Sequence, residues 1–296
     1  MDPSCLIAGC GYTGRRLARR LRPCWRVSAL ARSEAAAASL AAEGIVVVQA
    51  DLDAALPPHT LATTVDGAAI AYLVPPPDAG DADPRLGRFL VALGSARPAV
   101  LVYVSTTGVY GDTRGQPVTE DSPVSPANER ARRRVAAEDA AKAWCAGHGV
   151  RCVVLRVAGI YGPGRLPLDR LRRGEPALRP EDAGPGNRIH VDDLVTTCVA
   201  AIERPVQGAF NVTDGDTSST TVFLQRVAAL AGLPPPPLVP LAEAAGRVSP
   251  GMLAFLRESR RVDNRRMREE LGVVPRYVRV DDGIAASLAE MRESTG

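Results

Sequence analysis

The feature that most restricts the fold of this chain is a glycine-rich hexapeptide directly after its first apolar run. Residues 9–14 read Gly-Cys-Gly-Tyr-Thr-Gly, a G-x-G-x-x-G spacing between the apolar run 5–8 and a helix-like stretch. In this position Gly9 allows a tight turn, Gly11 lets the backbone approach a pyrophosphate, and Gly14 lets the helix pack closely on the strand. The free N–H groups of the helix N-terminus favour an anion. We therefore predict that this glycine loop binds a dinucleotide, through Gly9, Gly11, Tyr12, Thr13 and Gly14.

Apolar and helix-like segments alternate through the first half of the chain. The apolar runs are mostly continuous, as in parallel strands that are buried on both faces. They cover residues 5–8, 26–30, 45–49, 68–74, 99–104 and 152–155, and the helix-like stretches cover 14–21, 34–43, 84–95 and 126–148. This βαβαβ order predicts an α/β protein with a Rossmann-type doubly wound parallel sheet.

After Tyr161 the pattern loosens into loops rich in glycine and proline and into short helices. We interpret residues 1–165 as an NAD(P)-binding Rossmann domain, to which residues 188–211 return. Residues 166–296 then form a smaller, partly interleaved substrate-side region. The small C-terminal substrate domain itself is expected from about 166–187 and 212–261.

Composition excludes several other classes of protein. The 36 basic and 33 acidic residues nearly balance, which disfavours nucleic acid as the main partner. No apolar run approaches the roughly 18 residues of a membrane span, and the N-terminus lacks the basic start of a signal peptide. The six cysteines form no C-x-x-C pair, so neither a metal site nor a disulfide framework is indicated. We expect a cytoplasmic protein without a membrane partner, and leave a homodimer as an open alternative.

The end of the second predicted strand favours one of the two nicotinamide coenzymes. NAD recognition requires a carboxylate there, about 20 residues after the glycine loop. No acid precedes Glu34 in this stretch, and Arg32 and Ser33 stand where a 2′-phosphate would lie. The forked donors of a guanidinium suit a phosphate. We therefore predict that the coenzyme is NADP and not NAD. The alternative is that Arg32 is merely solvated and binds no phosphate.

Five further segments, together with the glycine loop, resemble the extended short-chain dehydrogenase/reductase family, also called the NAD-dependent epimerase/dehydratase family. They read VQADL, YVSTTGVYG, LRVAGIYGPG, RIHVDDL and GAFNV, at residues 48–52, 103–111, 155–164, 188–194 and 208–212. The likeness spans nearly the whole chain in the same order. It implies that Asp51 and Leu52 border the adenine, and we also assign Val74 and Ser105 to the cofactor site.

The family's chemistry uses a serine or threonine, a tyrosine and a lysine. The tyrosine exchanges a proton with the substrate oxygen, while the lysine tunes the tyrosine and binds the nicotinamide ribose. Matching on Tyr110 puts Thr106 at the first position, whereas Arg130 and Arg134 stand at the tyrosine and lysine positions. The one lysine, Lys142, has Glu138 four residues before it, so the chain contains no Y-x-x-x-K. The resemblance therefore implies an atypical member, with Thr106, Arg130 and Arg134 as candidate catalytic residues.

An arginine cannot act as the family's tyrosine does, because guanidinium stays charged and has no acceptor. Arg134 can still donate to the ribose, and Arg130, four residues earlier, shares its helix face. If the two point into the cleft, an anionic ligand or an acid such as Glu138 must lie between them. The alternative is a solvated basic face, since Arg132 and Arg133 belong to the same run.

Two tyrosines and one histidine are expected to have structural roles. Tyr110 and Tyr161 lie at strand ends near the predicted cofactor, and either is a conceivable displaced acid, but we expect both to hydrogen-bond within the protein. His190, followed by Asp192 and Asp193 in the first turn of a helix, is interpreted as a structural junction and not as a metal site.

Two functions of different classes follow. The first is an NADP-dependent oxidoreductase or epimerase/dehydratase-like enzyme that acts on an unknown small molecule. The arginines within residues 165–188 favour an anionic substrate. The second is a non-catalytic NAD(P)-binding sensor or regulatory protein. The complete glycine loop and Thr106 favour the enzyme, whereas Arg130 and Arg134 favour the sensor. We expect the enzyme.

Overall fold

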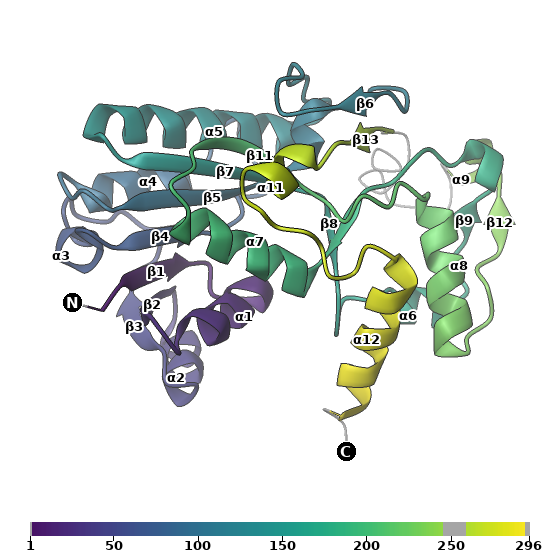
Figure 1. The fold of residues 1–296 in the computed structure, drawn as a ribbon, viewed down its shortest axis with the longest axis horizontal. Helices are drawn as coiled ribbons and strands as arrows, with labels where there is room; N and C mark the ends of the chain where they lie inside the picture. Colours follow the sequence, from purple (N-terminus) through teal and green to yellow (C-terminus); the bar gives the residue numbers. More distant parts are fainter. Residues whose placement is uncertain (1, 245–258, 294–296) are drawn as a thin grey trace.

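The computed structural model describes residues 2–244 and 259–293, and a seven-stranded sheet runs through its larger part (Figure 1). Every neighbouring pair of strands is parallel, in the order β11-β7-β5-β4-β1-β2-β3. The strands are β1 (Ser4–Ala8), β2 (Arg26–Ala31), β3 (Val46–Gln49), β4 (Ala69–Tyr72), β5 (Val100–Thr106), β7 (Arg151–Val157) and β11 (Gly208–Val212). The predicted doubly wound parallel sheet is confirmed. Its order turns back between β1 and β4, where open α/β sheets bind their ligands.

Alternate side chains of the strands enter two hydrophobic cores, one on each face of the sheet. In β1, Cys5 and Ile7 face one core, whereas Leu6 and Ala8 face the other. Both faces are buried, which is why the predicted strands are continuous apolar runs. Helices α1 (Tyr12–Leu21), α2 (Glu34–Ala42) and α7 (Val191–Glu203) cover the first face, and α3 (Ala62–Val65), α4 (Pro84–Leu93) and α5 (Glu129–His148) cover the second.

Two predicted elements have different ends in the structure. The strand predicted at 68–74 spans Ala69–Tyr72, and after a last bond from the Leu73 N–H to Ala8 O at 2.7 Å the chain passes close to Gly9. The helix predicted at 126–148 begins at Glu129. Asn128 caps it by accepting from the Ala131 N–H at 2.9 Å, so the residues before Asn128 are extended chain.

A smaller lobe with its own hydrophobic core is built from the second half of the chain. This core joins Tyr161 and Leu168 to Phe223 on α8 and Ile284 on α12. The elements of the lobe are β8 (Gly159–Tyr161), α6 (Leu168–Arg172), β9 (Ala177–Leu178), β10 (Arg188–His190), α8 (Thr220–Ala231), β12 (Leu238–Val239), α9 (Leu241–Ala244) and α12 (Val280–Glu293). The strands pair as β8–β10 and β9–β12, both parallel.

The chain crosses between the two cores more than once. β11 pairs with β7 in the main sheet and α7 packs on the main core, in line with a return of 188–211. Met267 on α11 (Arg265–Glu269) and Leu271 also join this core, although they lie in the predicted substrate-side region. β13 (Arg261–Val262) pairs with β6 (Pro117–Val118). The domain boundaries stay a prediction, and residues 245–258 of the expected substrate domain lie outside the described residues.

His190 lies at the junction between the two lobes, where it is fully buried and begins α7. Its Nδ1 accepts from the Asp192 N–H at 3.2 Å, and its Nε2 lies 3.2 Å from Ser287 Oγ on α12. Asp193 accepts from the backbone N–H groups of Arg276 and Tyr277. Burial lowers the pKa of His190 to about 4, so the ring is neutral at pH 7. These are the contacts of a structural junction.

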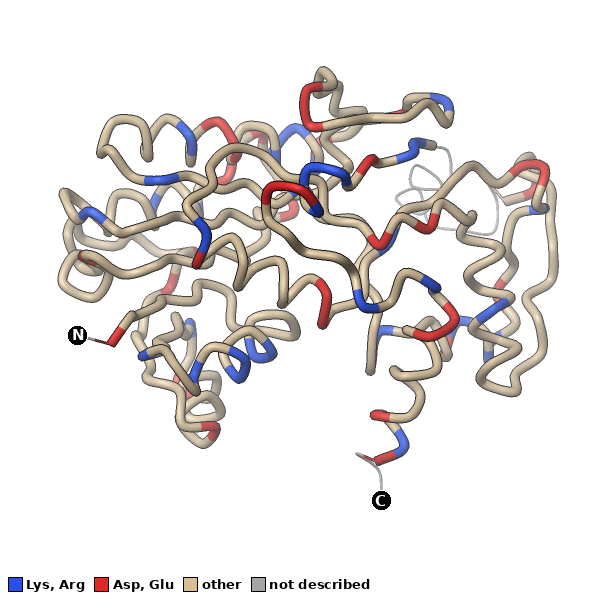
Figure 2. Tube along the Cα trace, in the orientation of Figure 1, with Lys and Arg blue, Asp and Glu red and all other residues tan. Residues whose placement is uncertain are grey.

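Two structural features bear on a membrane or a metal partner. Within the described ranges, no helix has both the length and the apolar character that crossing a membrane requires. The same ranges hold no group of three or more His, Cys, Asp or Glu side chains suited to a metal ion. Basic and acidic residues are interspersed along the chain (Figure 2).

Candidate active site

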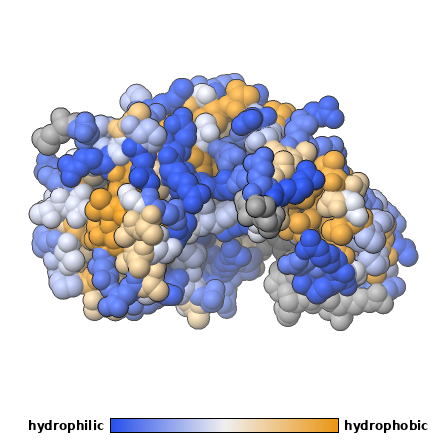
Figure 3. All heavy atoms as spheres, turned by 90° about the horizontal axis from the view of Figure 1, so that it is seen from below, coloured by the Kyte–Doolittle hydropathy of each residue, from blue (hydrophilic) through white to orange (hydrophobic). Residues whose placement is uncertain are grey.

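A cavity of about 1230 Å³ lies at the carboxyl ends of the main-sheet strands. It is lined by the glycine loop after β1, by the ends of β2, β5 and β7, and by α5 and parts of the smaller lobe. Viewed from below, the molecule is hollowed between its larger and smaller lobes (Figure 3). The volume lies above the range of about 300–1000 Å³ that is usual for small-molecule sites.

The three glycines of the loop have the geometry that dinucleotide binding requires. Gly9 has φ of +93°, and a Cβ there would lie 2.8 Å from the backbone of Leu73 and Val74. A Cβ on Gly14 would lie 2.5 Å from Gly9 O, so a side chain would push α1 away from the strand. A Cβ on Gly11 would meet nothing within 4 Å. Gly9 and Gly14 are therefore needed by the fold, whereas Gly11 leaves room for a ligand.

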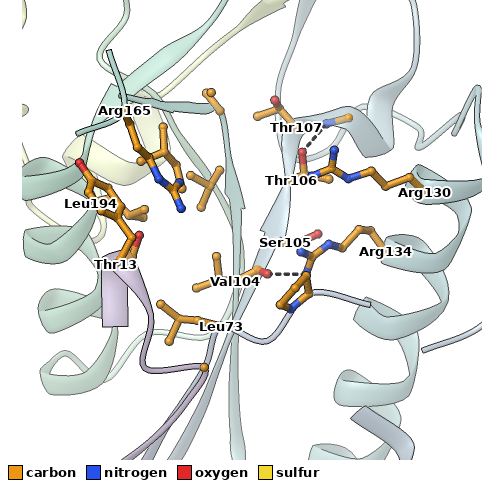
Figure 4. A pocket seen from close by; sticks show the side chains of 18 of the residues that line it. Thr13, Leu73, Val104, Ser105, Thr106, Thr107, Arg130, Arg134, Arg165 and Leu194 are labelled. Atoms are coloured by element: carbon orange, nitrogen blue, oxygen red, sulfur yellow. Dashed lines mark hydrogen bonds between the residues drawn. The ribbon is translucent and has the colours of Figure 1, made fainter. Parts of the chain in front are cut away.

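The guanidinium of Arg165 lies over the ring of Tyr12 in the glycine loop. The Arg165 guanidinium lies 4.2 Å from the Tyr12 ring centroid. Figure 4 shows Arg165 beside Thr13, on one side of the cavity. Arg165 makes no hydrogen bond or ion pair with another described side chain, and α1 has no acid in its first turn. The sequence suggested that Arg165 lies on the substrate side. The structure instead places it over the loop that would hold a pyrophosphate.

Directly after β2, Arg32 belongs to a charged cluster that the sequence did not reveal. Its Nη1 lies 3.3 Å from Asp53 Oδ2, and Arg85 binds the same carboxylate at 2.6 and 3.0 Å. The hydrogen bond from Arg85 holds the pKa of Asp53 below its usual range. Two guanidiniums against one carboxylate leave the cluster with a net positive charge. Arg32 lines the cavity with most of its side chain exposed.

Four of the predicted cofactor residues lie beside the cavity but do not line it: Ser33, Asp51, Leu52 and Val74. Ser33 Oγ accepts from the Ala36 N–H at 3.3 Å and caps α2. Asp51 Oδ1 accepts from the Asp53 N–H at 2.9 Å, which shapes the loop that carries Asp53. Leu52 is packed in the core. Their contact with a cofactor stays a prediction.

Thr106 and Ser105 end β5 at the cavity but face different partners. Thr106 Oγ1 accepts from the Gly108 N–H at 3.1 Å, which leaves the hydroxyl hydrogen free to donate into the cavity. Ser105 Oγ donates to Glu138 Oε1 at 2.6 Å. Thr106 is therefore placed to donate to a ligand, while the hydroxyl of Ser105, a predicted cofactor residue, is already bound to Glu138.

Two of the arginines of α5, Arg130 and Arg134, lie near Thr106, across the cavity from Arg165 (Figure 4). Arg134 is buried, and its Nη1 donates to Val104 O at 3.0 Å and to Tyr103 Oη at 3.1 Å. Its other nitrogens make no hydrogen bond with a described residue. Arg130 lines the same cavity and is exposed, with no hydrogen bond or ion pair to any residue in the described ranges. Both guanidiniums retain donors for a ligand.

Glu138 does not lie between the two arginines, which corrects the sequence expectation. It is buried and binds Arg156 Nη2 at 2.9 Å, Ser105 Oγ and, at 3.4 Å, Lys142. Each four-residue step along an α-helix turns the side chain by about 40°, so Glu138 is rotated away from Arg130 toward β7. Glu138 therefore does not compensate the charges of Arg130 and Arg134.

The tyrosines around the cavity have buried or hydrogen-bonded hydroxyls, including Tyr110 and Tyr161, the two considered as displaced acids. Tyr110 donates to Asn211 Oδ1 at 2.7 Å and accepts from Arg156, as a structural residue does. The hydroxyls of Tyr12, Tyr72 and Tyr161 are buried. Burial raises the pKa of Tyr103, which Arg134 contacts, to about 12. No displaced tyrosine acid is found among the described residues.

The lining of the cavity is strongly basic. Among the described residues, its charged members are seven arginines and one acid, Glu129; the arginines are Arg15, Arg32, Arg130, Arg133, Arg134, Arg165 and Arg260. Glu129 lies 3.7 Å from Arg133, and Arg15 pairs with Glu43. Arg260 donates to the carbonyls of Thr107 and Gly111. A dinucleotide and an anionic substrate both fit such a lining.

Comparison with known proteins agrees with this site. Residues 5–213 match the model of the NAD dependent epimerase/dehydratase family. A "3-diazoavenalumate denitrifying reductase" from a Streptomyces species is 35% identical over 141 residues, which cover 45% of this chain and 45% of that protein. The match thus spans less than half of the relative's length.

Two solved structures extend the likeness to the whole chain. A functionally unknown conserved protein from Silicibacter pomeroyi is 33% identical, with a TM-score of 0.83 over 97% of this chain and 99% of that one. MoeE5 in complex with UDP-glucose and NAD is 21% identical, with a TM-score of 0.76 over 99% and 100%, and shows the shared fold alone.

Proposed function

Because the chain belongs to the NAD dependent epimerase/dehydratase family, we propose that it is an NADP-dependent reductase of a small anionic molecule. The observation that carries the proposal is one continuous cavity. It joins the glycine loop, the positive cluster at Arg32 and the Thr106 hydroxyl. When bound, the nicotinamide coenzyme supplies or accepts hydride.

Different residues of this chain suit different parts of that coenzyme. The N–H groups at the start of α1 and the free guanidinium of Arg165 suit the pyrophosphate. Arg134 suits the nicotinamide ribose, because its uncommitted donors face the cavity from the position of the family's lysine. Thr106 donates its hydroxyl hydrogen to the substrate.

NADP is favoured over NAD by the charge of the Arg32 cluster. Asp53 supplies a carboxylate near the adenosine end, as NAD recognition requires. However, Arg85 already binds both oxygens of Asp53, and Arg32 adds a second guanidinium. The net charge therefore favours a 2′-phosphate, and the N-terminus of α2, capped by Ser33, adds a partial positive charge beside it.

The chemistry of the site suits a hydride transfer whose proton is exchanged with solvent, because neither Arg130 nor Arg134 can exchange it as a tyrosine does. The negative charge on the substrate oxygen is stabilised by the Thr106 hydroxyl and the guanidiniums. The reductase named among the relatives supports the direction of reduction.

A non-catalytic NAD(P)-binding sensor is the second candidate, because Arg130 and Arg134 stand where the family's tyrosine and lysine are expected. The deciding experiment measures NADPH consumption against carbonyl compounds with and without a carboxylate. Consumption that depends on substrate supports the reductase. Tight coenzyme binding without consumption on any member of the panel would favour the sensor.

A further inference from the structure

We propose that Arg130 binds a carboxylate of the substrate, so that the substrate is a small carboxylic acid reduced next to that group. The inference rests on the proposed function and names the substrate class of the same site. Arg130 stands beside Thr106 at the wall of the cavity opposite Arg165 (Figure 4). The reacting carbon would thus lie between a hydroxyl donor and a guanidinium.

Arg130 is a guanidinium that the protein leaves unpaired within the described ranges, and its exposed side chain lines the cavity. Arg134, four residues further along the same helix face, makes its protein hydrogen bonds to neutral oxygens and has the carboxylate of Asp83 in its electrostatic surroundings. The two acids of α5 nearest to Arg130 pair with other residues, Glu129 with Arg133 and Glu138 with Arg156. A ligand that brings its own negative charge can therefore pair with Arg130.

A carboxylate suits Arg130 better than the charge formed during the reaction. The alkoxide of a reduced carbonyl exists only transiently, whereas the Arg130 guanidinium stays charged throughout the catalytic cycle. The coenzyme's pyrophosphate is expected at the glycine loop, where Arg165 is available. One unpaired guanidinium matches one monoanion, and its fork fits the two oxygens of a carboxylate.

The rest of this part of the cavity suits the carbon skeleton of such an acid. Leu73, Val104, Val157, Ile160 and Leu194 contribute apolar side chains to the lining. An apolar body with one carboxylate therefore finds both kinds of partner, which is the usual composition of a small-molecule site.

Binding of benzoate and of its neutral isostere benzamide tests the proposal directly. We expect calorimetry on the protein saturated with NADP⁺ to show benzoate binding at least about tenfold tighter than benzamide, because a charge-assisted hydrogen bond is lost with the amide. Equal affinities would overturn the assignment.

Arg130→Gln should weaken benzoate by about tenfold or more and leave benzamide unchanged. Arg132→Gln is the matched control, since Arg132 is an exposed arginine on the same helix and does not line the cavity. It should leave both ligands unchanged. Full benzoate affinity in Arg130→Gln, or an equal loss in both variants, would contradict a specific carboxylate contact.

The same titrations separate this inference from the proposed function. Arg130→Gln should keep the NADP⁺ dissociation constant of the unmutated protein, and benzoate is also titrated without coenzyme. Arg130-dependent benzoate binding to a protein that does not bind NADP⁺ would support the carboxylate site while refuting the reductase. In a turnover assay, Arg130→Gln should raise KM for a 2-oxo acid and leave KM for its methyl ester unchanged.

Discussion

The two walls of the cavity differ in how closely they follow the family's pattern. On the wall formed by the glycine loop, each glycine has the geometry that its position in G-x-G-x-x-G requires. On the opposite wall, α5 retains the helix but carries Arg130 and Arg134 where a tyrosine and a lysine are expected. Backbone geometry determines the residue types of the first wall, whereas the reaction determines those of the second. Such a chain can keep its coenzyme and change its reaction.

The largest effect is expected deep in the second wall, at Glu138. Glu138→Gln removes the charge that compensates Arg156, and both residues are buried. Breaking a buried pair typically costs about 3–5 kcal/mol of the free energy of unfolding. Urea denaturation measures this cost, with the exposed neighbour Asp139→Asn as control. A loss no larger than that of the control would mean that α5 is not anchored through Glu138.

A smaller structural effect is expected in the first wall, at Gly9. Gly9→Ala places a Cβ 2.8 Å from the backbone of Leu73 at φ of +93°, which should cost about 2–4 kcal/mol of stability. Gly11→Ala is the contrast, because its Cβ meets nothing within 4 Å. It should leave thermal unfolding unchanged and still weaken NADPH. If Gly11→Ala binds NADPH normally, the pyrophosphate does not lie over Gly11.

Arg134→Gln tests whether the second wall also holds the coenzyme. Losing a charge-assisted contact to the ribose should weaken NADPH about tenfold, as measured by fluorescence titration. Arg132→Gln serves again as control, since it points away from the cavity. An unchanged affinity of Arg134→Gln for NADPH would mean that Arg134 serves only to hydrogen-bond Val104 and Tyr103.

The smallest effect is expected at the exposed Arg32. Arg32→Gln should weaken NADPH several-fold, and less than Arg134→Gln does, because solvent screens a side chain that is 69% exposed. NADH should bind as before. Parallel titration of both coenzymes gives the ratio, and an equal change for the two would remove the 2′-phosphate assignment.

Sequence patterns predicted what depends on local geometry. The strand and helix order and the glycine loop follow from periodicity and spacing, whereas Thr106 follows from the family resemblance, and the structure has these elements with small shifts at their ends. Sequence spacing did not reveal Asp53 beside Arg32, because the pair is made by two loops 21 residues apart. An acid soon after the third strand, close to the family's adenine segment, was the available signal.

The orientation of α5 shows a second limit. An i,i+4 series suggested that Glu138 lies between the arginines, but the drift of about 40° in each step turns it toward Arg156. Arg165 likewise seemed part of the substrate side, since nothing in its local sequence shows that it stacks on Tyr12. In both cases the partner comes from a distant strand or loop.

The most direct test of a reductase without a tyrosine acid follows the hydride itself. The protein is incubated with NADPH carrying deuterium at the transferable position and with a 2-oxo acid, and the product is analysed by mass spectrometry. We expect one deuterium on the carbon next to the carboxylate, and no transfer to a neutral ketone of equal size. Bound NADPH that keeps its deuterium with every substrate of the panel would contradict reduction and leave a coenzyme sensor.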